Sequence, residues 1–506
     1  MTRDVYSNYA IRRAAWQFLS GKAASALLTF IILLYLVRML SVFDYGAYVV
    51  FIAGTEIGIA LAGLGLPWLG ARYIPEYRLR ASGSDLGRLC LQLMLCQALA
   101  LIALVAIVAF AMDIYLSWAD LLAHRRASWF ALALLLTEGL GRFVREGLMA
   151  PLILQGQARV SLVLRQSLFL TTIVAFSFAG STELIWVLAA EVGASLAGYL
   201  VSVISFVWHL RSLRGQVGES GWQEPRVTNQ WRIALRMYVA QLISLTYSPQ
   251  VLINIVQRAL GAESAAVFGF LRTLYEQVAR YLPATLLFTV IRPKLMAIHL
   301  QGGVSGLTRQ VNLVGKVSLF VLMPIVMIVA LGGDGMVSLL SGGKFMGEGL
   351  LLLGLLIALV PCSQRQLLET VAVVTGRAGL CTFASVFGLL ALPFMIYLLD
   401  QGFGLWAPVL AILFGQITLN ATMLLGLKQI GYQADWRGAT KLAASAIFAG
   451  LVSVGVPSIE RNVIWLGLGC LLATLLFLAL VWWLQAFTLE ERQRFDGLIG
   501  RQLFTR

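Results

Sequence analysis

Charged residues are scarce in this chain. Only 12% of its 506 residues are Asp, Glu, Lys or Arg, while 59% are hydrophobic and the mean hydropathy is +0.84. Soluble domains carry about 25% charged residues, so this composition excludes an ordinary soluble domain and indicates a polytopic membrane protein. The net charge of +14 does not indicate nucleic-acid binding, because the cations cluster in short loops between apolar runs, as topology signals do.

Sequence motifs of enzymes and metal sites are also missing. The three histidines lie far apart along the chain, and no HExxH, GxSxG, Walker A or Asp-rich metal motif occurs. The five cysteines lie inside apolar runs without CxxC spacing, so we interpret them as small hydrophobic residues. The glycine-containing stretches 341–344 and 400–404 are interpreted as turns. We therefore expect a protein that is not an enzyme and needs neither a metal nor a cofactor.

Long apolar runs, in contrast, are abundant. About 20 apolar residues cover the hydrocarbon core of a bilayer, and the sequence predicts about 14 such spans. With the N-terminus inside, cytoplasmic segments hold about 25 Lys and Arg residues and outer loops about four, which places both termini in the cytoplasm. The predicted spans are roughly 16–38, 46–70, 89–112, 128–154, 161–180, 184–208, 236–258, 264–290, 311–332, 348–374, 380–399, 406–427, 440–457 and 463–487.

Polar, glycine and tryptophan residues recur at a constant offset of 220 residues. This repeat predicts two six-helix bundles, and an even number of spans gives both bundles the same orientation in the membrane. The predicted fold is therefore all-α, with two parallel six-helix repeats and a C-terminal helix pair. The pairs are Arg12 with Arg232, Arg38 with Arg258, Glu56 with Glu276, Arg145 with Arg365, Gly156 with Gly376 and Trp186 with Trp406.

The repeat and the loop composition together predict four regions. The longest loop is polar, basic and contains glycines, which is typical of a linker between two halves. The predicted regions are an N-terminal six-helix bundle (1–210), a cytoplasmic basic linker (211–235), a C-terminal six-helix bundle (236–430), and an appended helical hairpin with a cytoplasmic tail (431–506).

Several predicted spans carry charged residues, many at helical spacing. An arginine in lipid costs about 2.5–3.5 kcal/mol on insertion scales, so the faces that carry these charges are expected to look into protein or a water-filled cavity. A set of internal pairs that only joins helices is the structural alternative. The residues are Glu56 in the second span, Glu138, Arg142, Arg145 and Glu146 in the fourth, Glu191 in the sixth, Arg272, Glu276 and Arg280 in the eighth, and Arg365 and Glu369 in the tenth.

The arginines outnumber the glutamates that their spacing pairs them with. Three of the five could pair with Glu146, Glu276 and Glu369, so positive charge is left over unless another glutamate reaches across. An excess of cations in the membrane favours an anionic ligand, and a guanidinium offers phosphate two parallel hydrogen bonds while staying charged.

These considerations assign expected roles to the charged residues in the spans. Lys22 and Lys316 lie near the inner ends of their spans and are expected to extend to the membrane interface. We expect a cationic substrate-binding cavity formed by Arg142, Arg145, Arg272, Arg280 and Arg365, and coupling or charge-balancing roles for Glu56, Glu276, Glu146 and Glu369.

Two stretches resemble a known transporter family. Residues 40–66, LSVFDYGAYVVFIAGTEIGIALAGLGL, and 71–77, ARYIPEY, resemble the first outer loop, the second helix and its inner end in the polysaccharide-exporter family. Residues 336–359, MVSLLSGGKFMGEGLLLLGLLIAL, resemble the outer loop and helix after the ninth span. This family of O-antigen and lipid-linked oligosaccharide flippases is part of the multidrug/oligosaccharidyl-lipid/polysaccharide exporter superfamily. The resemblance implies a V-shaped pair of bundles around a central cationic cavity, working by alternating access.

The expected function is translocation of a polyprenyl-diphosphate-linked oligosaccharide from the cytoplasmic to the outer leaflet of a bacterial plasma membrane, for lipopolysaccharide or exopolysaccharide biosynthesis. An ion-coupled drug antiporter of the same superfamily is the alternative, which buried arginines disfavour because such cargo is often cationic. A membrane glycosyltransferase or polysaccharide ligase would need a larger extracytoplasmic domain. The expected partners are the lipid-linked glycan, membrane lipid, and polysaccharide polymerase or chain-length machinery, without nucleic acid.

Overall fold

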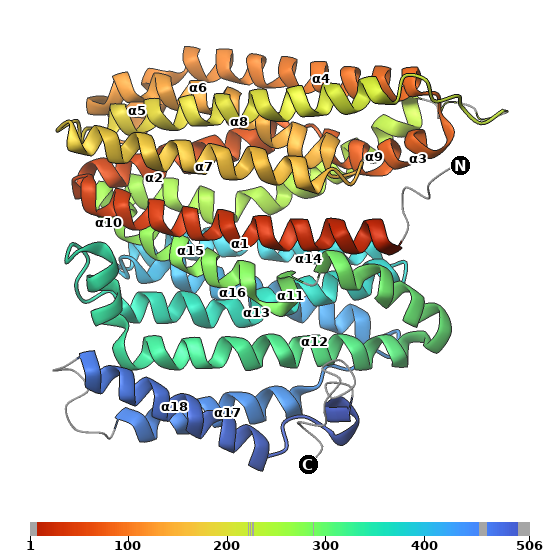
Figure 1. Cartoon of the computed structure of the whole chain (residues 1–506). Helices are drawn as coiled ribbons and strands as arrows, with labels where there is room; N and C mark the ends of the chain where they lie inside the picture. The colour runs from red at the N-terminus through yellow and green to blue at the C-terminus, as the bar shows by residue number, and fades with distance from the viewer. Residues whose placement is uncertain are drawn as a thin grey trace. The chain divides into compact units, whose positions relative to one another are not determined.

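The computed structural model describes residues 8–220, 222, 224, 227–286, 288–454 and 463–493, although not every side chain within these ranges. Throughout the described ranges the regular structure is helical, without strands. The chain divides into two compact units, Met1–Gly269 and Phe270–Arg506, whose helices are labelled in Figure 1.

The first unit contains the six predicted N-terminal spans and part of the predicted second half. Its helices are α1 (Asn8–Met39), α2 (Val42–Ala62), α3 (Leu66–Arg80), α4 (Gly83–Phe110), α5 (Met112–Trp118), a short 3-10 turn (Leu122–His124), α6 (Arg125–Arg142), a π-helical turn (Phe143–Met149), α7 (Gln155–Phe178), α8 (Leu184–Ser212), α9 (Val227–Thr246) and the larger part of α10 (Pro249–Tyr281).

The second unit begins within α10. Its remaining helices are α11 (Pro283–Leu286), α12 (Phe288–Ser341), α13 (Gly349–Val374), α14 (Ala378–Gly388), α15 (Ala391–Asp400), α16 (Trp406–Lys428), α17 (Trp436–Val454) and α18 (Val463–Trp483).

Ten helical segments in the described part of the chain are long and apolar enough to cross a bilayer, and Ala24–Met39 and Gly467–Trp483 are shorter apolar segments. A polytopic all-helical protein is confirmed, while the number of about 14 spans stays a prediction. The predicted eighth span, 264–290, is not one continuous helix, because α10 ends at Tyr281 and Pro283 begins α11.

The bounds of the helices follow the 220-residue offset of the sequence repeat. In the first unit α2 begins at Val42 and α4 at Gly83, while the second copy has backbone breaks at Gly261 (φ 84°) and Gly303 (φ 60°). Glycine permits these breaks because positive φ angles do not strain a residue without a Cβ. The bounds therefore favour an internal repeat, independently of residue identities.

The predicted linker contains a segment that lies on the first unit. The backbone N–H of Glu219 donates to the carbonyl of Arg80 at 2.8 Å, and Gly83 donates to the carbonyl of Gln216 at 3.0 Å. The hydroxyl of Tyr77 also donates to Glu224 at 2.9 Å. The first part of the predicted linker therefore packs against the C-terminal end of α3 and the N-terminal end of α4.

Two close helix contacts in the first unit depend on glycine. A Cβ on Gly46 of α2 would overlap the backbone carbonyl of Ala262 in α10, and a Cβ on Gly70 of α3 would overlap the carbonyl oxygen of Gly147. Small residues allow helix backbones to approach closely in membrane proteins. The second contact fixes α3 against the π-helical turn, which carries Arg145.

We expect Gly46→Ala to lower the apparent melting temperature of the purified protein, because forcing a side chain into a packed contact costs about 1–3 kcal/mol. Gly193→Ala is the control, since a Cβ there meets nothing within 4 Å. Thermal unfolding in detergent, followed by intrinsic fluorescence, measures both. Equal melting temperatures for the two variants would contradict the importance of this contact.

The C-terminal helices α17 and α18 pack against each other and against α12 (Figure 1). Their apolar contact includes Met323 of α12, Leu442 of α17 and Phe477 of α18. The second unit therefore includes the helix pair that the sequence places outside the repeat.

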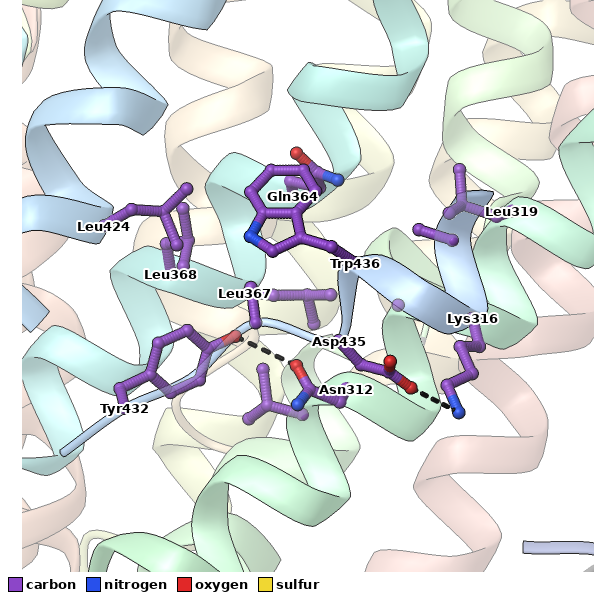
Figure 2. A pocket seen from close by; sticks show the side chains of 14 residues that line it. Asn312, Lys316, Leu319, Gln364, Leu367, Leu368, Leu424, Tyr432, Asp435 and Trp436 are labelled. Carbon is purple, nitrogen blue, oxygen red and sulfur yellow. Dashed lines mark hydrogen bonds and ion pairs between the residues drawn. The ribbon is translucent and has the colours of Figure 1, made fainter. Parts of the chain in front are cut away.

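An ion cluster supplements this apolar contact. Lys316 of α12 has its Nζ 2.6 Å from Asp435 Oδ2 and 2.8 Å from Glu491 Oε2. Figure 2 shows the Lys316–Asp435 pair beside the hydrogen bond from Tyr432 to Asn312. Lys316 is 3% exposed, and two carboxylates hold its ammonium group inside the protein, while its expected extension to the membrane interface stays a prediction. The side chain of Lys22 lies outside the described residues.

Acidification should weaken the attachment of α17. Burial raises the pKa of Asp435, but the hydrogen bonds from Lys316 and from the Gly438 N–H outweigh it and hold that pKa below its usual value of 3.8. A carboxyl group with a lowered folded-state pKa contributes stability above its unfolded pKa and loses it as the pH falls through the folded value. We therefore expect hydrogen exchange in residues 436–454 to rise as the pH falls below 3.8.

Asp435→Asn should remove part of this pH dependence, and Asp400→Asn, which changes an exposed carboxylate, should leave it intact. Hydrogen–deuterium exchange in lipid nanodiscs, corrected for the intrinsic pH dependence of exchange, provides the measurement. An unchanged pH profile in Asp435→Asn would show that this carboxylate does not control the attachment.

Candidate functional site

A buried glutamate in α6 joins two helices through arginines. Glu138 Oε1 lies 3.0 Å from Arg145 Nη2, and Glu138 Oε2 lies 3.0 Å from Arg165 Nε. The side chains of Glu138 and Arg145 are each 7% exposed. A carboxylate at this depth is stable only when its charge is compensated, so this double pairing holds α6, α7 and the π-helical turn together.

A second carboxylate extends the cluster into α8. Glu191 Oε1 lies 3.1 Å from Arg165 Nη2, and Glu191 Oε2 accepts a hydrogen bond from the Tyr48 hydroxyl at 3.1 Å. Ser195 accepts from Arg165 Nε at 2.8 Å. The first unit therefore contains a connected polar network whose members come from α2, α6, α7 and α8 and from the π-helical turn.

The local helix geometry explains how Arg145 reaches Glu138. Seven residues make almost two turns of an α-helix, so both side chains lie on nearly the same face. The N–H of Ala150 donates to the carbonyl of Arg145 at 3.1 Å, five residues back, which is a π-helical hydrogen bond. Such turns insert an extra residue into a helix and occur often at functional sites.

The described contacts of this network join three arginines to two glutamates. Arg142 Nε lies 3.8 Å from Glu138 and its side chain is 37% exposed. Arg145 Nη1 is buried and has no hydrogen-bond partner among the described residues. The network therefore includes one unused buried donor among the described residues, and Glu146 adds a further carboxylate near Arg145.

Two residues of the network, one in the fourth predicted span and one in the fifth, differ from what the sequence predicted. Glu138, which the sequence offered only as an alternative partner, occupies the centre of the network, whereas Glu146 is exposed. Arg165 was not among the expected site residues. The signal for Arg165 was present, because Arg165 and Gln166 form a polar pair inside an otherwise apolar span.

In the second unit the arginines form the predicted pairs at i, i+4 spacing. Arg272 Nη2 lies 2.6 Å and Arg280 Nη2 3.6 Å from the carboxylate of Glu276. Arg365 Nε lies 2.7 Å from Glu369 Oε1. The pairs are confirmed, while a role for them in substrate binding stays a prediction.

One interaction links residues near these pairs. Tyr275 of α10 and Cys362 of α13 interact electrostatically. Arg272 precedes Tyr275 by three residues, and Arg365 follows Cys362 by three, so each arginine lies about one helical turn from one of these side chains.

Glu56 is bound by an amide from α10. Gln250 Nε2 donates to Glu56 Oε2 at 2.6 Å. On the same face of α10, Asn254 accepts from the Tyr115 hydroxyl at 2.7 Å, and Gln257 donates to the carbonyl of Ala119 at 3.0 Å. This stripe of three amides attaches α10 to α2 and to the α5 segment, and it was not anticipated from the sequence.

Comparison with known proteins identifies the fold. No protein-family model and no curated protein sequence matches the chain. Among solved structures, the lipid II flippase MurJ in an inward closed conformation matches with a TM-score of 0.63 and 11% identity, covering 96% of this chain and 99% of MurJ. An inward-facing multidrug resistance MATE family transporter of the MOP superfamily matches with a TM-score of 0.60 and 14% identity, covering 82% and 98%.

The MATE transporter VcmN of Vibrio cholerae also matches, with a TM-score of 0.54, 13% identity, and coverage of 83% and 98%. The chain has the fold of MOP-superfamily transporters. The expected resemblance to this superfamily is thereby confirmed at the level of fold, whereas the polysaccharide-exporter family within it stays a prediction.

The matches to this MOP fold differ in how much of the chain they include. The MurJ match leaves 4% of the 506 residues uncovered, which is about 20 residues. Helices α17 and α18 have 19 and 21 residues, so together they are longer than the uncovered part. The MurJ match therefore includes at least part of the C-terminal helix pair. The MATE matches leave 17–18% of the chain uncovered.

We expect Glu138→Gln to destabilise the first unit by about 3–5 kcal/mol, because removing one partner leaves buried arginines uncompensated. Glu146→Gln is the matched control, since Glu146 is an exposed glutamate in the same span. Thermal unfolding in nanodiscs should give a markedly lower melting temperature for the first variant and an unchanged one for the second. Equal stability would mean that Glu138 does not compensate the arginines.

Proposed function

We propose that this protein is a flippase that moves a polyprenyl-diphosphate-linked oligosaccharide from the cytoplasmic to the outer leaflet of a bacterial plasma membrane by alternating access. The single observation that carries the proposal is the buried N–H group of Arg145, which has no partner among the described residues. Arg142 is partly exposed beside it. A diphosphate supplies acceptor oxygens that suit guanidinium donors of this kind.

Both units would contribute to binding. Arg272, Arg280 and Arg365 of the second unit are held by carboxylates on their own helices, which keeps the guanidinium groups oriented when no substrate is bound. Substrate phosphate would then compete with Glu276 and Glu369 for these arginines, so release of the glycan would restore the internal pairs. We propose that the arginines of both repeats bind the substrate, as the resemblance implies.

Coupling to an ion gradient is assigned to the equivalent glutamates Glu56 and Glu276. Each has a neutral or cationic partner that could remain in place when the carboxylate is protonated: Gln250 beside Glu56, and Arg272 beside Glu276. Protonation would change the charge of the site without removing a side chain. Glu146 and Glu369 would balance charge, and partners would include polysaccharide polymerase or chain-length machinery in lipopolysaccharide or exopolysaccharide biosynthesis.

A lipid-linked cargo is favoured over a drug by two features. MurJ, a lipid II flippase by name, matches over more of the chain than the MATE transporters do, including part of the C-terminal helix pair. Buried arginines also disfavour the cationic molecules that drug exporters often carry. The MATE matches keep an ion-coupled antiporter as the second candidate, while a glycosyltransferase or ligase has no supporting feature in the fold.

We expect Arg142→Ala and Arg365→Ala each to reduce transport at least tenfold, because a hydrogen bond to a charged group contributes about 1.5–3 kcal/mol and 1.4 kcal/mol is a factor of ten. The corresponding lysine variants should recover only part of the rate, since lysine lacks the planar fork. The measurement is translocation of a fluorescent undecaprenyl-diphosphate oligosaccharide in proteoliposomes.

Arg88→Ala, at an exposed arginine of α4, is the matched control and should transport normally. Full activity in both test variants would overturn the diphosphate site. Export of a cationic dye by the same proteoliposomes, without glycan translocation, would support the antiporter instead.

A further inference from the structure

The first unit contains an apolar cavity apart from the arginine network. Its volume is about 270 Å³, and it lies among α2, α4, α5, α6 and the first part of α10. Phe51, Gly58, Leu104 and Leu135 are among the side chains that line it. Apolar cavities of about 150 Å³ stay dry and bind small hydrocarbons, so this larger space suits a segment of hydrocarbon chain.

Four polar side chains in the lining already have partners inside the protein. The Thr55 hydroxyl donates to the carbonyl of Phe51 at 2.9 Å, and the Ser128 hydroxyl donates to the carbonyl of Arg125 at 2.7 Å. Tyr115 and Asn254 hydrogen-bond each other at 2.7 Å. A water cluster or a hydrophilic ligand needs several free polar partners, and these contacts leave little for it, whereas an apolar chain needs none.

The position of the cavity relates it to the proposed substrate site. Leu135 lines the cavity, and Arg142 follows seven residues later on α6, about 10 Å along the helix axis at 1.5 Å per residue. A lipid in the cytoplasmic leaflet has its head group toward the inside and its chain toward the outer leaflet. One amphiphile could therefore place an anionic head at the arginines and an apolar chain in the cavity.

The chain could enter from the bilayer beside α4. This helix borders the cavity through Leu104 and Val108, and only 17% of its most apolar window is buried inside the protein. Most of its surface therefore faces lipid. Gly54 of α2 leaves part of the opposite wall without a side chain, because a Cβ there would lie 3.7 Å from the Tyr115 hydroxyl.

We propose that this cavity binds the first isoprene units of the lipid-linked substrate while its diphosphate is held by the arginines. The inference rests on the proposed function and adds a site for the tail within the first unit. It assigns Gly54 to the recognition of the lipid, in addition to any role in helix packing.

The test uses the full-length protein in nanodiscs and two photoreactive probes, a diazirine-bearing polyprenyl diphosphate and a diazirine-bearing phosphatidylglycerol. We expect the isoprenoid probe to label peptides of α2 and α6 that line the cavity. Gly54→Leu should reduce this labelling at least fivefold, because leucine fills the space. Gly193→Leu, the same change at a helical glycine of α8 with nothing within 4 Å, should not reduce it.

Three results would overturn the tail site: no labelling of these peptides, equal labelling by phosphatidylglycerol, or undiminished labelling of Gly54→Leu. The second result would identify a bilayer lipid as the occupant. Translocation assays on the same preparations separate this failure from that of the proposed function. Glycan transport that depends on Arg142 but proceeds without cavity labelling would remove only the tail site, whereas cavity labelling without glycan transport would contradict the proposed flippase.

Discussion

The pairing of Glu138 with Arg145 and Arg165 is the interaction on which the first unit depends most. In a medium of low dielectric constant an unpaired charge is costly, and a shared carboxylate between two guanidinium groups reduces the cost for all three. The pairing also fixes geometry, because its members come from α6, the π-helical turn and α7. Glu191 continues the connection to α8 and, through Tyr48, to α2.

The two units compensate the charge of their arginines in different ways. In the second unit Glu276 and Glu369 each lie four residues from an arginine on the same helix, so these pairs form within one helix. In the first unit Arg165 of α7 pairs with Glu138 of α6 and with Glu191 of α8, so these pairs cross between helices. Pairs within one helix can open without separating helices, whereas the shared carboxylates of the first unit tie several helices together.

Glycine determines where helices break and where they touch. The positive φ angles of Gly261 and Gly303 interrupt α10 and α12 at positions that match helix starts in the first unit. Gly46 and Gly70 instead allow backbone contact between helices. Both uses follow from the absent Cβ, and both place the charged segments: the contact at Gly70 supports the π-helical turn of Arg145, and the break at Gly261 begins the helical segment of Arg272.

The sequence by itself determined the membrane class and the all-helical fold and predicted an internal repeat, because hydropathy and residue spacing are local properties of the chain. It also determined the Arg272–Glu276 and Arg365–Glu369 pairs, since i, i+4 neighbours meet on any helix. Only the tertiary structure decided that Glu138 is the shared partner, that Arg165 joins it, and that Lys316 is held by two carboxylates. Those contacts link residues far apart in sequence, so their distances depend on how helices pack, which periodicity within one helix does not specify.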